Sequence, residues 1–378
     1  MNKTTEGHAG IPEFSDTEMT FQLMRQLGAS AYRASSIGEC VAIANTVQQN
    51  NAQEWVQEFE RLAEWQKKDG IERLVNNHVV SGREQLLRAS NSFRAAEYYT
   101  PQASEHSKKL GLNSIDCFCS ALAAMDLHFE NHSIPYTNIS LPAYFISPAN
   151  DGMKRKTILI LSGFDETMEE SFFFRGFGAI ERGYNVILFA GPGSIDVLRK
   201  YSHTCFKPDF EQILKRIINY FEFRQEIDKH NLSLMGLGTG AYFSIQATCH
   251  EPRIKALIVN SPILDLHAYL SAYILNPSQS DAKTDHFIQS FGQGSVEANL
   301  EYLKFFVLNE SLSSIKAPCL ALIGEQEGNE PKKQFDEFCK QMDATHYIFS
   351  NAEGAGSHCQ IGNSSFANAV AYDWLDGL

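Results

Sequence analysis

The chain has 378 residues and a mass of 42.4 kDa, enough for two or three compact units with a sizeable buried core. Its formal charge of -13 argues against nucleic acid and anionic membranes as partners, because both are bound through clustered Lys and Arg. No apolar run approaches the ~18 residues of a membrane span, and the N-terminus lacks the apolar segment of a signal peptide. We therefore expect a cytoplasmic protein. The sequence leaves a homodimer open.

Eight cysteines are scattered along the chain without the spacing of a disulfide framework, which favours reduced thiols. Cys117 and Cys119 are the only close pair, and they lack His or Cys partners at the spacing of zinc ligands. We expect neither a metal nor a cofactor.

The first part of the chain has the apolar period of helices from Asp16 to about Leu127. The residues that show this period are Phe21, Met24 and Leu27, followed by Trp55, Phe59, Leu62 and Trp65. The pattern predicts an α-helical N-terminal unit over residues 1–127. This unit could serve packing alone, or it could act as a cap over a site in the second unit.

Near Asp126 the helical period gives way to the alternation of strands. Residues 127–148 predict short strands broken by Pro135 and Pro142, which suits edge or antiparallel positions. After the turn at 150–152, continuous apolar strands alternate with helices, as in a parallel sheet covered on both faces. The predicted strands are 156–163, 185–191, 232–236, 255–261 and 319–324, with a later one at 345–349. The predicted helices are 167–182, 209–228, 239–249, 331–342 and 364–378.

This order of elements predicts an α/β doubly wound, mostly parallel sheet over residues 128–378. Ligands of such sheets bind beyond the carboxyl ends of the strands. The segment 265–306 has no strand character and is rich in Tyr, Phe and Leu. We expect it to form a lid.

The glycine-rich turn at 236–241, GLGTGA, fits two devices. One is the dinucleotide fingerprint G-x-G-x-x-G/A, which normally follows the first strand and has an acidic residue ~20 positions later. Here at least two strands precede the turn, and the next strand ends in Val259 and Asn260, without a carboxylate. The other device is the G-x-S-x-G nucleophile elbow, which would place the nucleophile at Gly238.

The partners that an elbow requires follow in the expected order. Glu325 and Glu327 come after the strand 319–324, and His358 lies in a glycine-rich loop after the strand 345–349. An early loop at 162–165 would supply one oxyanion N–H from Phe164 or its neighbour, and Thr239 would supply the second. The sequence therefore favours the elbow.

The chain also resembles one branch of the α/β-hydrolases: the FrsA-like esterases, 2,6-dihydroxypseudooxynicotine hydrolase and the hydrolases that shorten aromatic polyketide chains. The segments that carry the resemblance are 163–165 with 169–170, 182–185, 191–193, 206–211, 356–360 and 373–375. The resemblance implies an α/β-hydrolase fold with a helical N-terminal region and cleavage of an ester or of a carbon–carbon bond beside a ketone. It implies an aryl ketone or polyketide-like substrate.

The resemblance also assigns the site residues. Its catalytic positions are Gly238 for the nucleophile, Glu327 for the acid, with Glu325 as the alternative, and His358 for the base. Its substrate contacts are Asp165, Glu169 and Tyr242.

The sequence departs from this family at the nucleophile position, and this departure decides which catalytic chemistry remains. Gly238 has no group that could form an acyl-enzyme, so only His358/Glu327 acid-base chemistry and the oxyanion donors remain. Ser162, Thr239 and Cys359 are nearby but are not expected to have the elbow geometry. Three interpretations follow: an enzyme that works through the dyad, a pseudo-hydrolase that binds a ligand or partner, and an engineered replacement of Ser by Gly.

Overall fold

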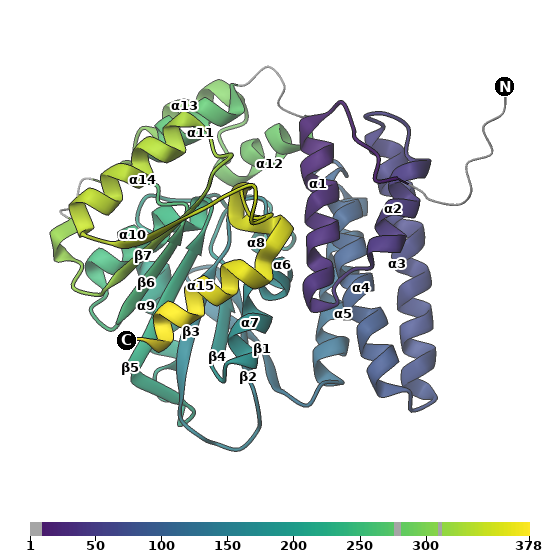
Figure 1. The fold of residues 1–378 in the computed structure, drawn as a ribbon, viewed down its shortest axis with the longest axis horizontal. Coiled ribbons are helices and arrows are strands. Elements are labelled where there is room, and N and C mark those ends of the chain that lie inside the picture. Colours follow the sequence, from purple (N-terminus) through teal and green to yellow (C-terminus); the bar gives the residue numbers. More distant parts are fainter. Residues whose placement is uncertain (1–9, 276–280, 309–311) are drawn as a thin grey trace. The chain divides into compact units, whose positions relative to one another are not determined.

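A computed structural model describes residues 10–275, 281–308 and 312–378, which form two compact units (Figure 1). The first unit ends at Ala121 and the second begins at Leu122.

The first unit is helical, as the apolar period predicts. Its helices are α1 (Thr17–Gly28), α2 (Ile37–Thr46), α3 (Ala52–Val75), α4 (Val79–Tyr98) and α5 (Glu105–Ala123), with a short turn at Ala29–Tyr32. The Asp16 side chain caps α1 by accepting the N–H groups of Glu18 and Met19. Gly70 and Gly82 let α3 and α4 approach closely, since a Cβ on Gly82 would lie 2.7 Å from Leu74.

The second unit contains one eight-stranded sheet in the order β1-β2-β4-β3-β5-β6-β7-β8. The strands are β1 (His128–Tyr136), β2 (Ile139–Ser147), β3 (Arg155–Leu161), β4 (Asn185–Phe189), β5 (Ile227–Leu237), β6 (Ala256–Asn260), β7 (Cys319–Gly324) and β8 (Thr345–Phe349). Strands β3 to β8 are parallel, whereas β1 and β2 pair antiparallel with each other and β2 pairs antiparallel with β4. The predicted doubly wound α/β architecture is confirmed.

Helices alternate with the strands in the second unit. They are α6 (Met168–Ser171), α7 (Phe177–Glu181), α8 (Ile195–Leu198), α9 (Glu211–Phe221), α10 (Thr239–His250), α11 (Leu266–Ile274), α12 (Asp281–Phe291), α13 (Val296–Leu303), α14 (Asn329–Met342) and α15 (Ser364–Asp376). In Figure 1, α15 runs in front of the central strands. Helices α11, α12 and α13 lie within the segment predicted as a lid.

Three predicted elements differ from the structure. The helix predicted at 209–228 ends at Phe221, and β5 already begins at Ile227. The helix predicted at 167–182 contains a π-helical turn at Phe172–Gly176 between α6 and α7. Pro135 and Pro142 do not break their strands, because both lie inside the nine-residue strands β1 and β2.

The register of the sheet brings the carboxyl ends of its central strands to one edge. Leu161 in β3 pairs with Gly236 in β5, and Leu237 pairs with Asn260 in β6. Gly324 in β7 pairs with Phe349 in β8. The loops that follow β3, β5, β6, β7 and β8 therefore leave the sheet on the same side, where ligands of such folds bind.

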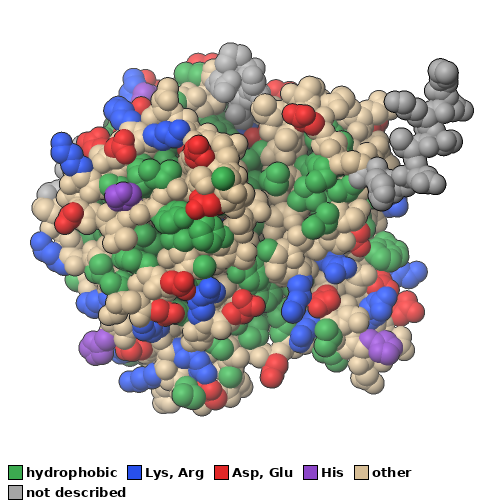
Figure 2. Space-filling model, viewed as in Figure 1, with side chains coloured by type: hydrophobic (Ala, Val, Ile, Leu, Met, Phe, Trp, Pro, Cys, Tyr) green, Lys and Arg blue, Asp and Glu red, His purple; other side chains and the backbone are tan. Residues whose placement is uncertain are grey.

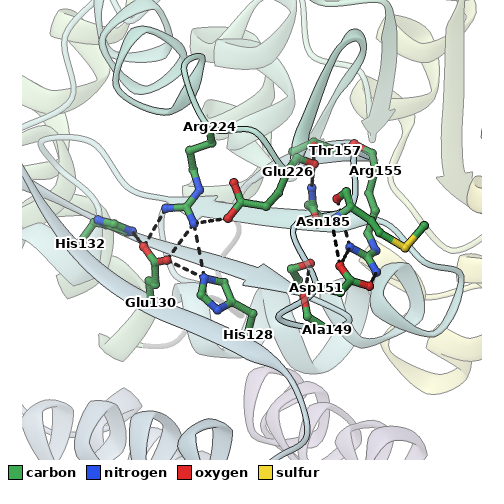
Figure 3. A network of polar contacts seen from close by, with 12 residues as sticks. His128, Glu130, His132, Ala149, Asp151, Arg155, Thr157, Asn185, Arg224 and Glu226 are labelled. Atoms are coloured by element: carbon green, nitrogen blue, oxygen red, sulfur yellow. Dashed lines mark hydrogen bonds and ion pairs between the residues drawn. The ribbon is translucent and has the colours of Figure 1, made fainter.

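A charged network fastens β1 to the turn before β5 (Figure 3). Both oxygens of Glu130 accept hydrogen bonds of 2.8 Å from Arg224, and Glu130 also lies 2.6 Å from His128 Nε2 and 2.8 Å from His132 Nε2. Arg224 donates a further bond of 2.9 Å to Glu226. The hydrogen bond from Arg224 is the main reason that the pKa of Glu130 falls to about 2.

Replacing Glu130 with Gln is expected to lower the free energy of unfolding by about 1 kcal/mol at neutral pH, since the partly exposed pair is screened by solvent. The pKa of Glu130 in the folded state lies below its ordinary value of 4.5, so the stabilisation is complete above that value and is lost as the pH falls toward 2. Urea unfolding of both proteins between pH 7 and pH 3.5 should show the difference shrinking.

The control is Glu301→Gln, which removes an exposed ion pair with Lys304 on α13. Its unfolding midpoint should match that of the unmodified protein at each pH. A Glu130→Gln midpoint that equals this control at pH 7 would contradict the stabilising role of the network.

Charges of both signs are interspersed on the face of the molecule drawn in Figure 2, and Lys and Arg do not gather there into one basic patch. Within residues 10–275, 281–308 and 312–378, none of the helices combines the length and the apolar character that crossing a membrane requires.

Candidate active site

The predicted elbow is a sharp turn between β5 and α10. Gly238 stands between the two elements with φ 52° and ψ -127°, a conformation that L side chains rarely adopt. Its N–H donates to Asn260 O at 2.7 Å, and its carbonyl accepts from Ala241 N at 2.9 Å. The sharp turn is thus held by the neighbouring strand β6 and by the first turn of α10.

The two flanking glycines are explained by close packing of backbone. A Cβ on Gly240 would lie 2.4 Å from Leu161 O, and a Cβ on Gly236 would lie 2.6 Å from Gly240 O. Both contacts are too short for any side chain. The glycines of this turn therefore let α10 approach β3 and β5, and they need no bound phosphate to account for them.

The elbow points at the predicted base. A Cβ built on Gly238 would lie 3.4 Å from His358 Nε2 and 3.8 Å from Gly163 Cα. A side chain at position 238 would thus meet the imidazole directly. The structure brings together the nucleophile position after β5, the base after β8 and the loop after β3.

The other imidazole nitrogen faces the acid. His358 Nδ1 lies 3.2 Å from Glu327 Oε2. The second oxygen of Glu327 accepts from Ser261 Oγ at 2.5 Å and, more weakly, from Gly324 N at 3.4 Å. Glu325 instead accepts from the N–H of Asn351 at 2.7 Å. Of the two glutamates that the sequence offered, Glu327 is the one that contacts the base.

His358 and Glu327 shift each other's pKa in opposite directions. Burial raises the pKa of Glu327, but the charge of His358 and the bonds from His358 and Ser261 outweigh this effect and lower it. Burial lowers the pKa of His358, but the acidic neighbours Cys359, Tyr269 and Glu327 outweigh it and raise the pKa well above 6.5. The imidazole ring is still about one-third exposed, at 34%, so it can exchange protons at Nε2.

The oxyanion loop lies against the elbow. A Cβ on Gly163 would lie 3.7 Å from Thr239 N and 3.5 Å from Leu237 O, so the residue before Phe164 contacts the first residue of α10. Both Phe164 and Thr239 are buried. That the two N–H groups share one substrate oxygen stays a prediction.

The three predicted substrate contacts lie in different surroundings. Asp165 forms an ion pair of 3.5 Å with Lys283 of α12. Glu169 is fully buried and accepts from Tyr144 Oη at 2.6 Å. Tyr242 is also buried, with its ring 6.2 Å from that of Phe306. Their contact with a substrate stays a prediction.

Several residues that hold the base loop in place were not predicted. Arg175 donates a 2.5 Å bond to the carbonyl of Cys359. The amides of Asn260 and Gln360 bond to each other at 2.7 and 3.3 Å, which ties the loop to the end of β6. Ser261 also lies at this end of β6. The one sequence signal was the position of Asn260 and Ser261 at the carboxyl end of a predicted strand.

In the described part of the chain, no three His, Cys, Asp or Glu side chains are grouped so as to hold a metal ion. The group of this site with acid-base chemistry is the His358 imidazole, whose Nε2 faces position 238 and whose Nδ1 faces Glu327.

Curated relatives are named as hydrolases. The alpha/beta hydrolase xenA of Xenoacremonium sinensis is 30% identical over 256 residues, a match that covers 65% of this chain but only 60% of that protein. The hydrolase LUC6 of a Fusarium species is 25% identical, and its match covers 96% of this chain and 97% of that protein. No protein-family model matches the chain.

A solved structure has the same fold over nearly the whole chain. The crystal structure of 2,6-dihydroxy-pseudo-oxynicotine hydrolase superposes with a TM-score of 0.77 at 18% identity, covering 92% of this chain and 94% of the other. The fold, the order of the elements around the elbow and the curated relatives agree with one another. The chain has the α/β-hydrolase fold, which it shares with 2,6-dihydroxy-pseudo-oxynicotine hydrolase, and its sequence is similar to proteins named as hydrolases.

Proposed function

We propose that the chain is a hydrolase-type enzyme that cleaves an ester or a carbon–carbon bond beside a carbonyl in an aryl ketone or polyketide-like substrate. The observation that carries this proposal is the contact of 3.4 Å between the Cβ position of Gly238 and His358 Nε2, with Glu327 at 3.2 Å behind the imidazole. These two distances support the roles of base for His358 and of orienting acid for Glu327, beside an elbow that lacks its nucleophile.

In this proposal, His358 and Glu327 act as the acid-base pair. The volume that a serine side chain would fill beside Nε2 suits a water molecule or a bulky part of the substrate. His358 removes a proton from the attacking water or from the substrate and returns it to the leaving group. The N–H groups of Phe164 and Thr239 stabilise the oxyanion or enolate as it forms. Asp165, Glu169 and Tyr242 contribute to substrate binding.

The substrate class is supported by similarity. One solved relative is named for its action on 2,6-dihydroxy-pseudo-oxynicotine, and the curated relatives carry the general name hydrolase. An aromatic group of side chains adjoins the elbow helix, where Phe206 and Phe243 stack with ring centroids 4.8 Å apart and Phe243 lies 6.2 Å from Phe306. These rings are buried and pack against one another beside α10.

A second candidate is a pseudo-hydrolase that binds a ligand or a partner protein without consuming it. Gly238 itself favours this candidate, since removal of a triad nucleophile usually leaves only the residual rate from oxyanion stabilisation and binding. The elbow, the dyad and the oxyanion loop would then be retained as the walls of a binding site.

Consumption of ligand separates the two candidates. We would incubate the protein with a panel of aryl esters and β-diketones, measure binding by calorimetry and follow each compound by mass spectrometry over many hours. The proposal expects at least one compound to be converted to cleavage products at a rate proportional to enzyme concentration. Tight binding of a compound that stays intact would instead establish the pseudo-hydrolase.

A further inference from the structure

The thiol of Cys359 lies close to His358 Nε2, the imidazole nitrogen that also faces the elbow position. Its Sγ is 3.4 Å from His358 Nε2, the nitrogen that also lies 3.4 Å from the Cβ position of Gly238. Sγ is also 3.7 Å from the carbonyl oxygen of Asn260, which accepts the Gly238 N–H. The thiol, the base and the empty elbow position therefore share one small region at the end of β5 and β6.

The backbone that places this thiol is strained. Cys359 and Gln360 have φ of 51° and 48°, a conformation that side-chain-bearing residues rarely adopt and that persists where the surroundings enforce it. Arg175 holds the Cys359 carbonyl, and the amide pair of Gln360 and Asn260 holds the next residue. These contacts fix the direction in which the Cys359 side chain leaves the loop.

Four of the other cysteines have surroundings that keep them as thiols. Burial raises the pKa of Cys40, Cys117 and Cys319 to about 12, and that of Cys339 to about 11. Cys359 differs because it is partly exposed and lies beside an imidazole that an acid orients. A cysteine nucleophile is activated by a neighbouring base such as an imidazole.

We propose that Cys359 is the nucleophile that His358 activates, so that the side chain next to the base supplies the attacking atom that Gly238 lacks. The inference rests on the proposed function for the base, the acid and the oxyanion donors, and it replaces water by the thiol in the first step only. The substrate is an ester or a β-diketone whose carbonyl enters the volume above Gly238.

The step balances as an acyl transfer. The thiol proton moves to His358 Nε2 while Sγ attacks the carbonyl carbon, and the carbonyl electron pair becomes an oxyanion. When the oxyanion collapses, the bond to the alkoxide or enolate breaks, and the leaving group takes the proton from the imidazolium. Water then hydrolyses the thioester with His358 as base, which releases the carboxylic acid and restores the thiol.

The absence of a side chain at 238 fits this role. A serine there would place its Cβ 3.4 Å from Nε2, so its hydroxyl would compete with the Cys359 thiol for the one proton acceptor. Glycine leaves that acceptor to the thiol and leaves room for the carbonyl carbon to approach Sγ.

Alkylation tests the inference without a known substrate. We would treat the full chain with iodoacetamide at neutral pH and follow each cysteine peptide by mass spectrometry, in the unmodified protein and in His358→Gln. We expect the labelling rate of Cys359 to fall at least tenfold in His358→Gln, while that of Cys339 is unchanged. Equal rates for Cys359 in the two proteins would overturn the proposal. Circular dichroism checks that His358→Gln is folded.

Acylation gives the second readout. With p-nitrophenyl acetate, the acetyl group should be found on the Cys359 peptide, and turnover should be lost in Cys359→Ala and in Cys359→Gly, the latter chosen because glycine accepts the positive φ. Cys339→Ala is the matched control and should keep full turnover.

The outcomes separate this inference from the proposed function. If Cys359→Gly keeps turnover while His358→Gln loses it, the thiol is not the nucleophile and water remains the attacking group. If the unmodified protein turns over no ester or diketone but Cys359 labelling still depends on His358, the thiol pairing is supported and the hydrolase function fails.

Discussion

Replacing Gly238 with Ser is expected to make the protein react covalently with a fluorophosphonate probe, whereas the chain as it stands does not react at position 238. The Cβ of the new residue would lie 3.4 Å from His358 Nε2, so one rotamer brings its hydroxyl within hydrogen-bond reach of the base. Labelling is measured by gel fluorescence, and the modified residue is identified by peptide mass spectrometry.

The substitution also has a cost in stability. Gly238 has a φ of 52°, and an L side chain in that conformation costs about 1–3 kcal/mol. Gly238→Ala is therefore the matched control: it should lose the same stability as Gly238→Ser and should show no labelling at position 238. Adding His358→Gln to Gly238→Ser should also remove the labelling. If Gly238→Ser is folded and is not labelled, the turn is not a nucleophile elbow.

Replacing His358 with Ala is expected to reduce turnover by about 10³-fold, within the usual range for loss of a general acid-base. Glu327→Gln should lower turnover less, since the imidazole stays in place but loses the carboxylate that orients it at 3.2 Å. His230→Ala, which changes an exposed histidine in β5, is the control and should leave turnover unchanged.

The dependence of turnover on pH is expected to show whether His358 acts as a base. The pKa of His358 is raised well above 6.5, chiefly because the acidic groups around it outweigh its burial. Below that pKa the imidazolium has no lone pair to accept a proton. Turnover that depends on His358 as a base should therefore rise as the pH is raised through the alkaline side of neutrality. A profile that is flat from pH 6 to pH 9, or full turnover in His358→Ala, would exclude the role.

Most of the fold could be predicted because its signals are local. Each central strand is a short apolar run, and the helices of the first unit keep a period of three to four residues. The boundary after Phe221 was missed for a tertiary reason: Arg224 and Glu226 belong to the network with Glu130 on β1, and Ile227 enters the sheet. The helical spacing of apolar residues in 209–228 does not indicate that Arg224 and Glu226 bind to this network or that Ile227 begins a strand.

The loops that carry the candidate residues could be predicted because their order is fixed by chain connectivity. The sequence could place Gly238, His358 and two glutamates after the correct strands, but the choice of Glu327 over Glu325 depends on which side chain turns toward the imidazole. The Cys359 contact was missed for the same reason. Its direction follows from a left-handed backbone held by Arg175 and Gln360, and no periodicity in sequence encodes such a conformation.

Gly238 has φ 52° and ψ -127°, the dihedral angles of a sharp turn, although glycine could adopt many other conformations at this position. The conformation is therefore imposed by what surrounds it: the bond to Asn260 and the backbone contacts of Gly236 and Gly240. Because these contacts involve neighbouring backbone, they do not depend on which side chain stands at position 238. For protein engineering, the backbone at position 238 is thus already fixed, and serine, cysteine and aspartate could be compared there as nucleophiles.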